Sequence, residues 1–267
     1  GTVSGSTISF QTPAVFAAAS TGASDFNGPF STFDTSLDKL IIAYRDGGDS
    51  NKLSVIAGKM SGTTITFDTE ATSSFSTVSN VGIGFDSNIN KAVIAYKYTT
   101  ASHTGAASIF QAGGSLEKLT SENFIGFAHA AYADGQKATV KTTGSIARNI
   151  PQVPSASDAI GSAVIFESGD TYLWKGTVYD TNSDRLVIFY IDGDDSNKGK
   201  AIVGTVSGNS VTFGTAVTFI SETVDTGEGN LAAVFDSNAN KVVVFYKNST
   251  DTEGRAHVGT VDPSDNS

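Results

Sequence analysis

The sequence predicts an all-β protein made of five repeats, most simply a five-bladed β-propeller with four-stranded blades. Three observations support this prediction: a motif that recurs with constant internal spacing, several strand-like segments in each unit, and weak helical periodicity throughout. A period of about fifty residues is typical of repeat architectures, and four strands in that length match one propeller blade. An open β-solenoid, or a strand-swapped chain of hairpin modules, would give the same pattern and is the alternative.

The repeated motif is an aromatic residue followed by Asp, a basic residue five positions after the Asp, and a Tyr five positions after that. Its four copies are Phe33, Asp34, Lys39 and Tyr44; Phe85, Asp86, Lys91 and Tyr96; Tyr179, Asp180, Arg185 and Tyr190; and Phe235, Asp236, Lys241 and Tyr246. We interpret each Asp as a turn former that pairs with the motif Lys or Arg across the turn, because Asp side chains accept hydrogen bonds from backbone N–H groups two residues on. The motif residues are therefore expected to serve the repeat.

The last complete unit shows the expected strands in order. Residues 201–206 alternate as a half-buried strand would, 207–210 form a tight hairpin turn, and 211–213 return. Residues 231–235 lead through a second turn into 241–246, a nearly continuous apolar run. Such a run suits a strand that is covered on both faces.

We expect residues 1–267 to form one repeat domain. Its units are predicted at 4–59, 60–111, 112–152, 153–206 and 207–261, with 262–267 as a hairpin remnant or a joint. The middle unit is divergent: residues 132–140 supply an aromatic, an Asp turn and a strand in the right phase, but the motif Tyr is missing.

The two ends of the sequence complement each other. Residues 1–8 begin at the end of a unit's opening strand, whereas 255–261 form an opening strand whose hairpin, 262–267, has no returning strand. Within one chain this fit would close a ring. Between chains it would produce a head-to-tail homopolymer by strand addition.

Composition restricts the classes of partner. The net charge is −10, only 16% of residues are charged, and Lys and Arg do not cluster, which argues against nucleic-acid binding. Cysteine is absent, so a disulfide framework and thiolate metal sites are excluded. No apolar stretch reaches the roughly 18–20 residues of a membrane span, and no signal peptide is visible. Such compositions are common in extracellular and virion β proteins.

We do not predict an enzyme. A five-bladed glycosidase needs unlike carboxylates with separate roles, whereas the four motif aspartates open identical turns. The histidines at 103, 129 and 257 are scattered and lack zinc-site spacing, and no Gly-x-Ser-x-Gly elbow or cofactor motif is present.

Three further sets of residues are weaker candidates for binding or modification. Two acidic loops carry oxygen ligands of the kind that Ca²⁺ prefers, but no bidentate Glu at a fixed offset, so solvated turns are the favoured interpretation. Aromatic residues outside the motif could stack on sugar rings or simply pack. These candidates are Asp46, Asp49 and Asn51 in the first loop; Asp192, Asp194, Asp195 and Asn197 in the second; the aromatics Tyr98, Tyr172 and Trp174; and Asn248 in a glycosylation sequon.

Two phrases resemble a known group of proteins. Residues 204–219 and their counterpart 1–16 resemble tandem repeats in structural proteins of tailed phages, especially marine ones. Residues 119–127 and 131–135 resemble a segment that recurs beside those repeats. The resemblance covers most of the chain and implies a virion appendage or another extracellular structural role, without catalytic residues. Related repeats also suit secreted bacterial fibres.

Together these observations predict a non-enzymatic structural subunit of an extracellular or virion assembly, such as a phage tail or fibre component or a secreted filament. It would assemble through its β-repeat surfaces, with strand complementation between the ends. The alternative is a lectin-like propeller that binds surface glycans, and a glycosidase is a remote third.

Overall fold

The computed structural model describes residues 12–17, 30–98, 103–113, 158–173, 175–227 and 229–264, and the backbone of short strands at 2–4, 7–9, 127–128 and 140–141. All regular elements in these ranges are strands, so the all-β prediction is confirmed. The same residues contain no helix that is long and apolar enough to cross a membrane.

The chain divides into two compact units. Residues 113–157 form the smaller unit, in which β11 (Phe127–Ala128) pairs antiparallel with β12 (Val140–Lys141). Residues 1–112 and 158–267 form the larger unit, which holds every copy of the motif. At its start, β1 (Thr2–Ser4) and β2 (Thr7–Ser9) pair with each other as a hairpin.

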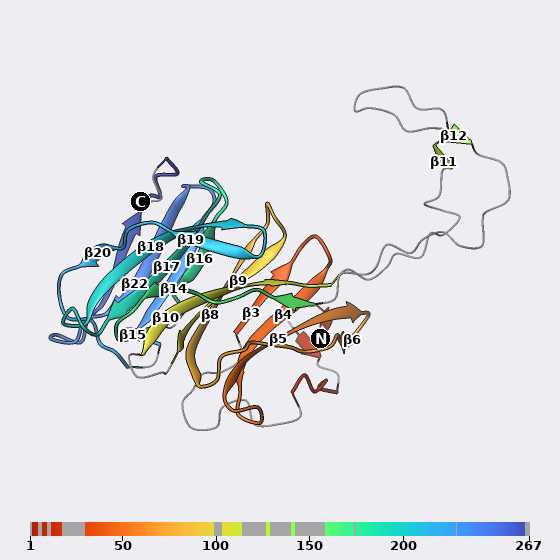
Figure 1. The fold of residues 1–267 in the computed structure, drawn as a ribbon, viewed down its shortest axis with the longest axis horizontal. Coiled ribbons are helices and arrows are strands. Elements are labelled where there is room, and N and C mark those ends of the chain that lie inside the picture. Colours follow the sequence, from red (N-terminus) through yellow and green to blue (C-terminus); the bar gives the residue numbers. More distant parts are fainter. Residues whose placement is uncertain are drawn as a thin grey trace. The chain divides into compact units, whose positions relative to one another are not determined.

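Besides the β1–β2 hairpin, the described part of the larger unit contains four antiparallel sheets, which follow one another along the sequence (Figure 1). The first sheet consists of β3 (Phe30–Asp34), β4 (Lys39–Asp46), β5 (Lys52–Ser61), β6 (Thr64–Phe67) and β7 (Ala71–Thr72). The second consists of β8 (Val78–Asp86), β9 (Lys91–Tyr98), β10 (Thr104–Gln111), β13 (Ala159–Ile160) and β14 (Val164–Glu167). The third consists of β15 (Thr171–Tyr172), β16 (Thr177–Asp180), β17 (Arg185–Asp192), β18 (Lys198–Ser207), β19 (Ser210–Phe213) and β20 (Val217–Ile220), and the fourth of β21 (Leu231–Asp236), β22 (Lys241–Lys247) and β23 (Gly254–Gly259).

The first three sheets share one plan. A strand ends at the motif Asp, the next begins at the motif Lys or Arg, and a long third strand pairs with the second. Two short strands then pair with the third strand: β6 and β7 with β5, β13 and β14 with β10, and β19 and β20 with β18. In the fourth sheet the described residues supply only the first three strands.

The 94-residue gap between the second and third motif copies contains two strands, β13 and β14, that belong to the second sheet. The chain leaves the second sheet after β10, passes through the smaller unit, and returns as β13 and β14 to pair with β10 again. Most of the divergent unit expected at 112–152 lies outside the described residues. The count of five units therefore stays a prediction, as does ring closure, since no described strand pairing joins the fourth sheet to the first.

The sheets pack face to face because their second strands are apolar on both faces. We call the face that carries the motif Tyr the tyrosine face and the other one the opposite face. The opposite face of each sheet packs on the tyrosine face of the next: Ile41 and Ala43 of the first sheet share a core with Ile94 and Tyr96 of the second. Equivalent cores join the second sheet to the third and the third to the fourth. This double coverage explains the continuous apolar runs.

Candidate interaction surface

The motif aspartates form the same turn in all four sheets. One carboxylate oxygen (Oδ1) of each accepts hydrogen bonds from the backbone N–H groups two and three residues on, at 2.9 and 3.1 to 3.2 Å. This contact is what the turn interpretation predicts. The four carboxylates lie in four separate sheets.

Burial distinguishes two of these chemically identical turns. Asp180 is buried with Ser183 beside it, whereas Asp236 and its turn are exposed. Asp180→Ala should lower the free energy of unfolding by about 1–3 kcal/mol, because buried N–H groups lose their acceptor, and Asp236→Ala by less than about 1 kcal/mol, because water replaces the carboxylate. Urea denaturation of both variants measures this difference, and equal losses would contradict it.

The motif tyrosines are core residues with satisfied hydroxyl groups. Tyr44 donates to Glu70 at 2.8 Å and Tyr190 to Glu167 at 3.2 Å, and Tyr96 bonds Ser108 at 3.0 Å. Burial, chiefly, raises the pKa of each of these three tyrosines. Tyr246 is also buried and lies against His257.

Tyr179 stands where the other motif copies have Phe, and it links two sheets. Its hydroxyl donates to Asp184, and burial followed by hydrogen bonds to Asp184 and Asp86 raises its pKa. Asp86 belongs to the preceding sheet. One repeat earlier, Phe85 takes the place of Tyr179, and Asp34 takes the place of Asp86. The Oδ2 atom of Asp34 is buried and has no hydrogen-bond partner among the described residues.

This difference predicts opposite effects of two reciprocal substitutions. Tyr179→Phe should cost about 1–2 kcal/mol of stability, because the Asp184 carboxylate loses a donor. Phe85→Tyr should be neutral or stabilising by up to about 1 kcal/mol, because the new hydroxyl group would lie near Asp34 Oδ2. In urea denaturation, the midpoint should fall for Tyr179→Phe and should not fall for Phe85→Tyr. A loss in both would mean that the repeats are not equivalent here.

The first acidic loop uses its oxygens within the chain. Asp46 accepts from the Gly48 N–H at 2.7 Å, Asp49 pairs with Lys52 at 2.9 Å, and Asn51 accepts from Arg45 at 2.9 Å. These contacts are those of a solvated hairpin turn.

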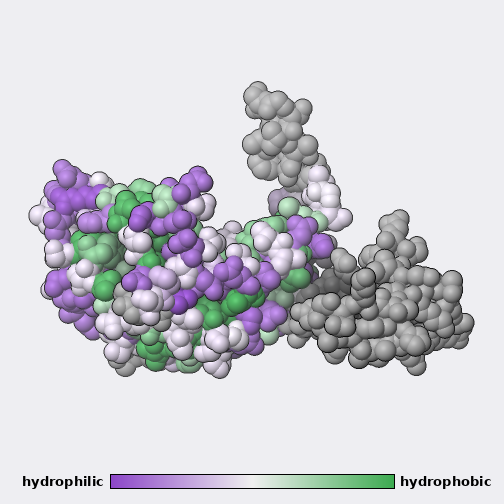
Figure 2. Space-filling model, turned by 90° about the horizontal axis from the view of Figure 1, so that it is seen from above, coloured by the Kyte–Doolittle hydropathy of each residue, from purple (hydrophilic) through white to green (hydrophobic). Residues whose placement is uncertain are grey.

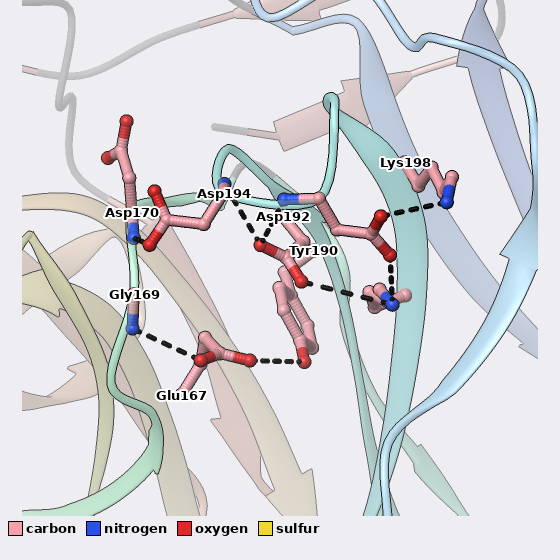
Figure 3. A network of polar contacts seen from close by, with 9 residues as sticks. Glu167, Gly169, Asp170, Tyr190, Asp192, Asp194 and Lys198 are labelled. Atoms are coloured by element: carbon pink, nitrogen blue, oxygen red, sulfur yellow. Dashed lines mark hydrogen bonds and ion pairs between the residues drawn. The ribbon is translucent and has the colours of Figure 1, made fainter.

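The second acidic loop joins a wider network (Figure 3). Asp192 Oδ1 accepts from the N–H groups of Asp194 and Asp195, and Asp194 Oδ2 accepts from the Asp170 N–H at 3.2 Å. Hydrogen bonds from Lys198 and then Lys200 lower the pKa of Asp195. The Asn197 carbonyl accepts from the Val224 N–H at 2.9 Å. Within the described ranges, no three His, Asp or Glu side chains gather as a metal site would require.

The proposed sugar-stacking aromatics have neighbours of their own. Tyr98 packs edge-on against Phe75 with ring centres 4.8 Å apart, and Lys97 Nζ lies 4.3 Å from the centre of the Tyr172 ring. Trp174 lies outside the described residues. The glycan-binding role therefore stays a prediction.

Asn248, the sequon residue, is buried. Its side-chain nitrogen donates to Glu222 at 2.6 Å, and its oxygen accepts from the Thr250 N–H at 2.8 Å. In the folded chain, the side-chain nitrogen that would carry a glycan is therefore buried. The sequon alone does not indicate this burial.

The opposite face of the fourth sheet is the largest departure from the repeat plan. Val234, Phe245 and Val258 on this face are 51%, 46% and 67% exposed. The residues at the same register positions of the third sheet, Val178, Phe189 and Val203, are 8%, 4% and 5% exposed, because the fourth sheet covers them.

The uncovered face is also hollowed. An open depression of about 320 Å³ lies over β21, β22 and β23, and Ala232, Phe245 and Arg255 are among the residues that line it. Figure 2 shows, on one side of the molecule, hydrophobic residues gathered in patches between hydrophilic ones. Apolar patches on a soluble protein often mark interaction sites.

The tyrosine face of the first sheet is the other end of the series. Leu40, Ile42, Tyr44 and Ile56 line it, and Phe16 with Ala17 packs against them. Phe33, also on this face, is 40% exposed, whereas its counterpart Tyr179 is only 7% exposed beneath the preceding sheet. Sequence reasoning missed both end faces, because it could not show which sheet covers which.

Comparison with known proteins leaves the chain without an assigned family. No protein-family model matches it, and no curated protein matches it.

Proposed function

We propose that this chain is a non-enzymatic structural subunit that associates with copies of itself through the outer faces of its first and fourth sheets. The exposed apolar face of the fourth sheet is the observation that carries this proposal. Three valine and phenylalanine positions that are 4–8% exposed in the third sheet are 46–67% exposed here. Leaving them in water forgoes about 25 cal/mol for each Å² of apolar area.

The partner of this face follows from the order of the sheets. The opposite faces of the first, second and third sheets each pack on the tyrosine face of the next sheet. Among the described residues no sheet precedes the first one: on its tyrosine face Phe33 is exposed, whereas Tyr44 at the centre is buried beneath Phe16. Two unlike, complementary faces on one subunit make a head-to-tail contact, which generates rings or filaments according to its rotation.

The propeller architecture belongs to the same proposal. The first strands of successive sheets contact one another in the order β3, β8, β16 and β21, as the inner strands of neighbouring propeller blades do. In our proposal this series continues from one chain into the next. The lightly charged, cysteine-free composition and the resemblance to phage repeats support an extracellular or virion setting, such as a tail or fibre component or a secreted filament.

Sedimentation velocity across a range of concentrations, with negative-stain electron microscopy, tests the proposal on residues 1–267. We expect oligomers that grow with concentration and regular filaments or rings. Association should persist at high salt, because apolar contacts are not screened. A protein that stays monomeric at every concentration up to about 100 μM would overturn the proposal, because a structural interface should hold at or below the μM affinity range.

A further inference from the structure

We infer that the chain forms an internal amide cross-link, in which the side-chain amine of Lys97 condenses with the carboxyl group of Asp170 and releases water. The bond joins β9 to the loop at residues 168–170, which leads from β14 of the second sheet to β15 of the third. This inference goes beyond the proposed function and does not depend on self-association. It assigns a covalent bond between distant parts of a chain that has no cysteine for disulfides.

Lys97 occupies a core position of the repeat. It follows the motif residue Tyr96 and lies on the opposite face of the second sheet, where the third sheet carries the fully buried Ile191. Both residues pair with a glycine of the third strand, Lys97 with Gly105 and Ile191 with Gly199. The Lys97 side chain is only 8% exposed. Because burying an ammonium ion is costly, a reaction that removes its charge is favoured here.

The Asp170 carboxyl group is held against this amine. Lys97 Nζ lies 2.7 Å from Asp170 Oδ1. The Asp170 backbone is fixed by the second acidic loop: its N–H donates to Asp194 Oδ2 at 3.2 Å (Figure 3), and its carbonyl accepts from the Gly193 N–H at 2.7 Å. A β-carbon on Gly193 would lie 2.9 Å from Asp170 Oδ2, so the glycine leaves room for the carboxyl group. The amine and the carboxyl group are therefore positioned before they react.

Two side chains that can carry protons flank the pair. His103 Nδ1 lies 3.6 Å from Asp170 Oδ1, the same oxygen that contacts the amine. Thr171 fixes His103 there, because its N–H and its hydroxyl group donate to the His103 carbonyl at 3.3 and 3.2 Å. The Tyr172 ring centre lies 4.3 Å from Lys97 Nζ, and burial followed by the Asp170 carboxylate raises the pKa of Tyr172. An amine, a carboxyl group and a proton carrier thus meet at one oxygen atom.

The reaction is a condensation that needs no oxidant or reductant. A proton passes from the Lys97 ammonium group to the Asp170 carboxylate, and the neutral amine then forms a bond to Asp170 Cγ. The bond from Cγ to Oδ1 breaks, and Oδ1 leaves as water. His103 Nδ1 donates a proton to the leaving oxygen and takes one from the nitrogen, so it ends as it began. Positioning raises the effective concentration of the amine to about 10⁵–10⁸ M, which offsets the unfavourable equilibrium of amide formation in water.

Two other ion pairs of the same chain serve as comparisons. Lys39 Nζ lies 2.6 Å from Asp68 Oδ2, but the Asp68 side chain is 37% exposed. Lys247 Nζ lies 2.7 Å from Asp225 Oδ2, but the Lys247 side chain is 39% exposed. In the described part of the chain, no His side chain forms an ion pair with either carboxylate. We therefore expect both pairs to stay unlinked.

Mass spectrometry of the denatured protein tests the cross-link directly. The wild-type chain should be lighter than its sequence by one water, about 18 Da. Lys97→Arg keeps the positive charge but removes the primary amine, so this variant should have its full mass. After tryptic digestion of the denatured wild type, a branched peptide should join the segments around Lys97 and Asp170, and no branch should occur at Lys39 or Lys247.

Three results would overturn the inference. The first is a wild-type chain of full mass, which would mean that Lys97 and Asp170 form only an ion pair. The second is a loss of water that persists in Lys97→Arg, because an Asp residue can also lose water by closing a succinimide ring. The third is a branched peptide at Lys39 or Lys247 in place of Lys97, because burial and the neighbouring His103 would then not decide which pair reacts.

A time course after cell-free synthesis tests the role of His103. His103→Asn should form the cross-link about a hundredfold more slowly, the usual effect of losing a proton-transfer group. Asn suits this site because it tolerates the φ of 52° that His103 adopts. An unchanged rate would overturn the role given to His103. Thermal unfolding supplies a second readout: the midpoint of Lys97→Arg should be about 10 °C below that of the wild type, because the variant lacks a cross-link that closes a long loop.

Discussion

Replacing Phe245 by Glu should convert assembled protein to monomers while leaving the unfolding midpoint nearly unchanged. Phe245 lies at the centre of the exposed face, in β22 between Ala232 and Ala256. In the proposed head-to-tail contact Phe245 would be buried against the first sheet of another copy, as Phe189 is buried against the fourth sheet. An unpaired carboxylate there must be desolvated or protonated, so we expect association to weaken by about a hundredfold or more, or roughly 3 kcal/mol.

Ile165→Glu is the matched control. Ile165 is also a large exposed apolar residue, at 60%, but it lies in β14 of the second sheet and outside both end faces. Sedimentation velocity should show this variant assembling as the wild type does. If the two variants dissociate equally, the effect is one of added charge and the fourth sheet is not the interface.

Replacing Gly176 by Ala should strongly destabilise the contact between the third and fourth sheets. A β-carbon at this position would lie 2.3 Å from the Phe189 carbonyl oxygen and 2.7 Å from a methyl group of Leu231. The oxygen belongs to the backbone of β17, and the Phe189 N–H donates to the Gly176 carbonyl at 2.7 Å, so neither strand can move away without breaking the pairing. We expect a loss of about 1–3 kcal/mol or more, the range of overpacked cores.

Gly254→Ala provides the comparison, because a β-carbon on Gly254 would meet nothing within 4 Å. Thermal unfolding should be nearly unchanged for this variant. For Gly176→Ala the midpoint should fall by about 2–4 °C for each kcal/mol lost, given the size of the larger unit. A wild-type midpoint for Gly176→Ala would show that the two sheets are not held together as described.

Local chemistry made much of the repeat predictable. The alternation in 201–206 and the apolar run in 241–246 predicted strands that the structure contains as β18 and β22. The spacing from Asp236 to Lys241 predicted the turn, because an Asp side chain can bond only backbone N–H groups a few residues on. These features depend on neighbours in the sequence and on the two-residue period of a strand.

Tertiary structure decided what the sequence could not, because contacts between residues far apart in the chain have no local signature. Residues 113–157 cluster as a compact unit of their own, and beyond them β13 and β14 return to pair with β10 of the second sheet, a pairing between residues about fifty positions apart. The sequon at Asn248 looked accessible, but packing buries it. Phe189 and Phe245 occupy the same position in their repeats, and only the presence or absence of a covering sheet makes one a core residue and the other exposed surface.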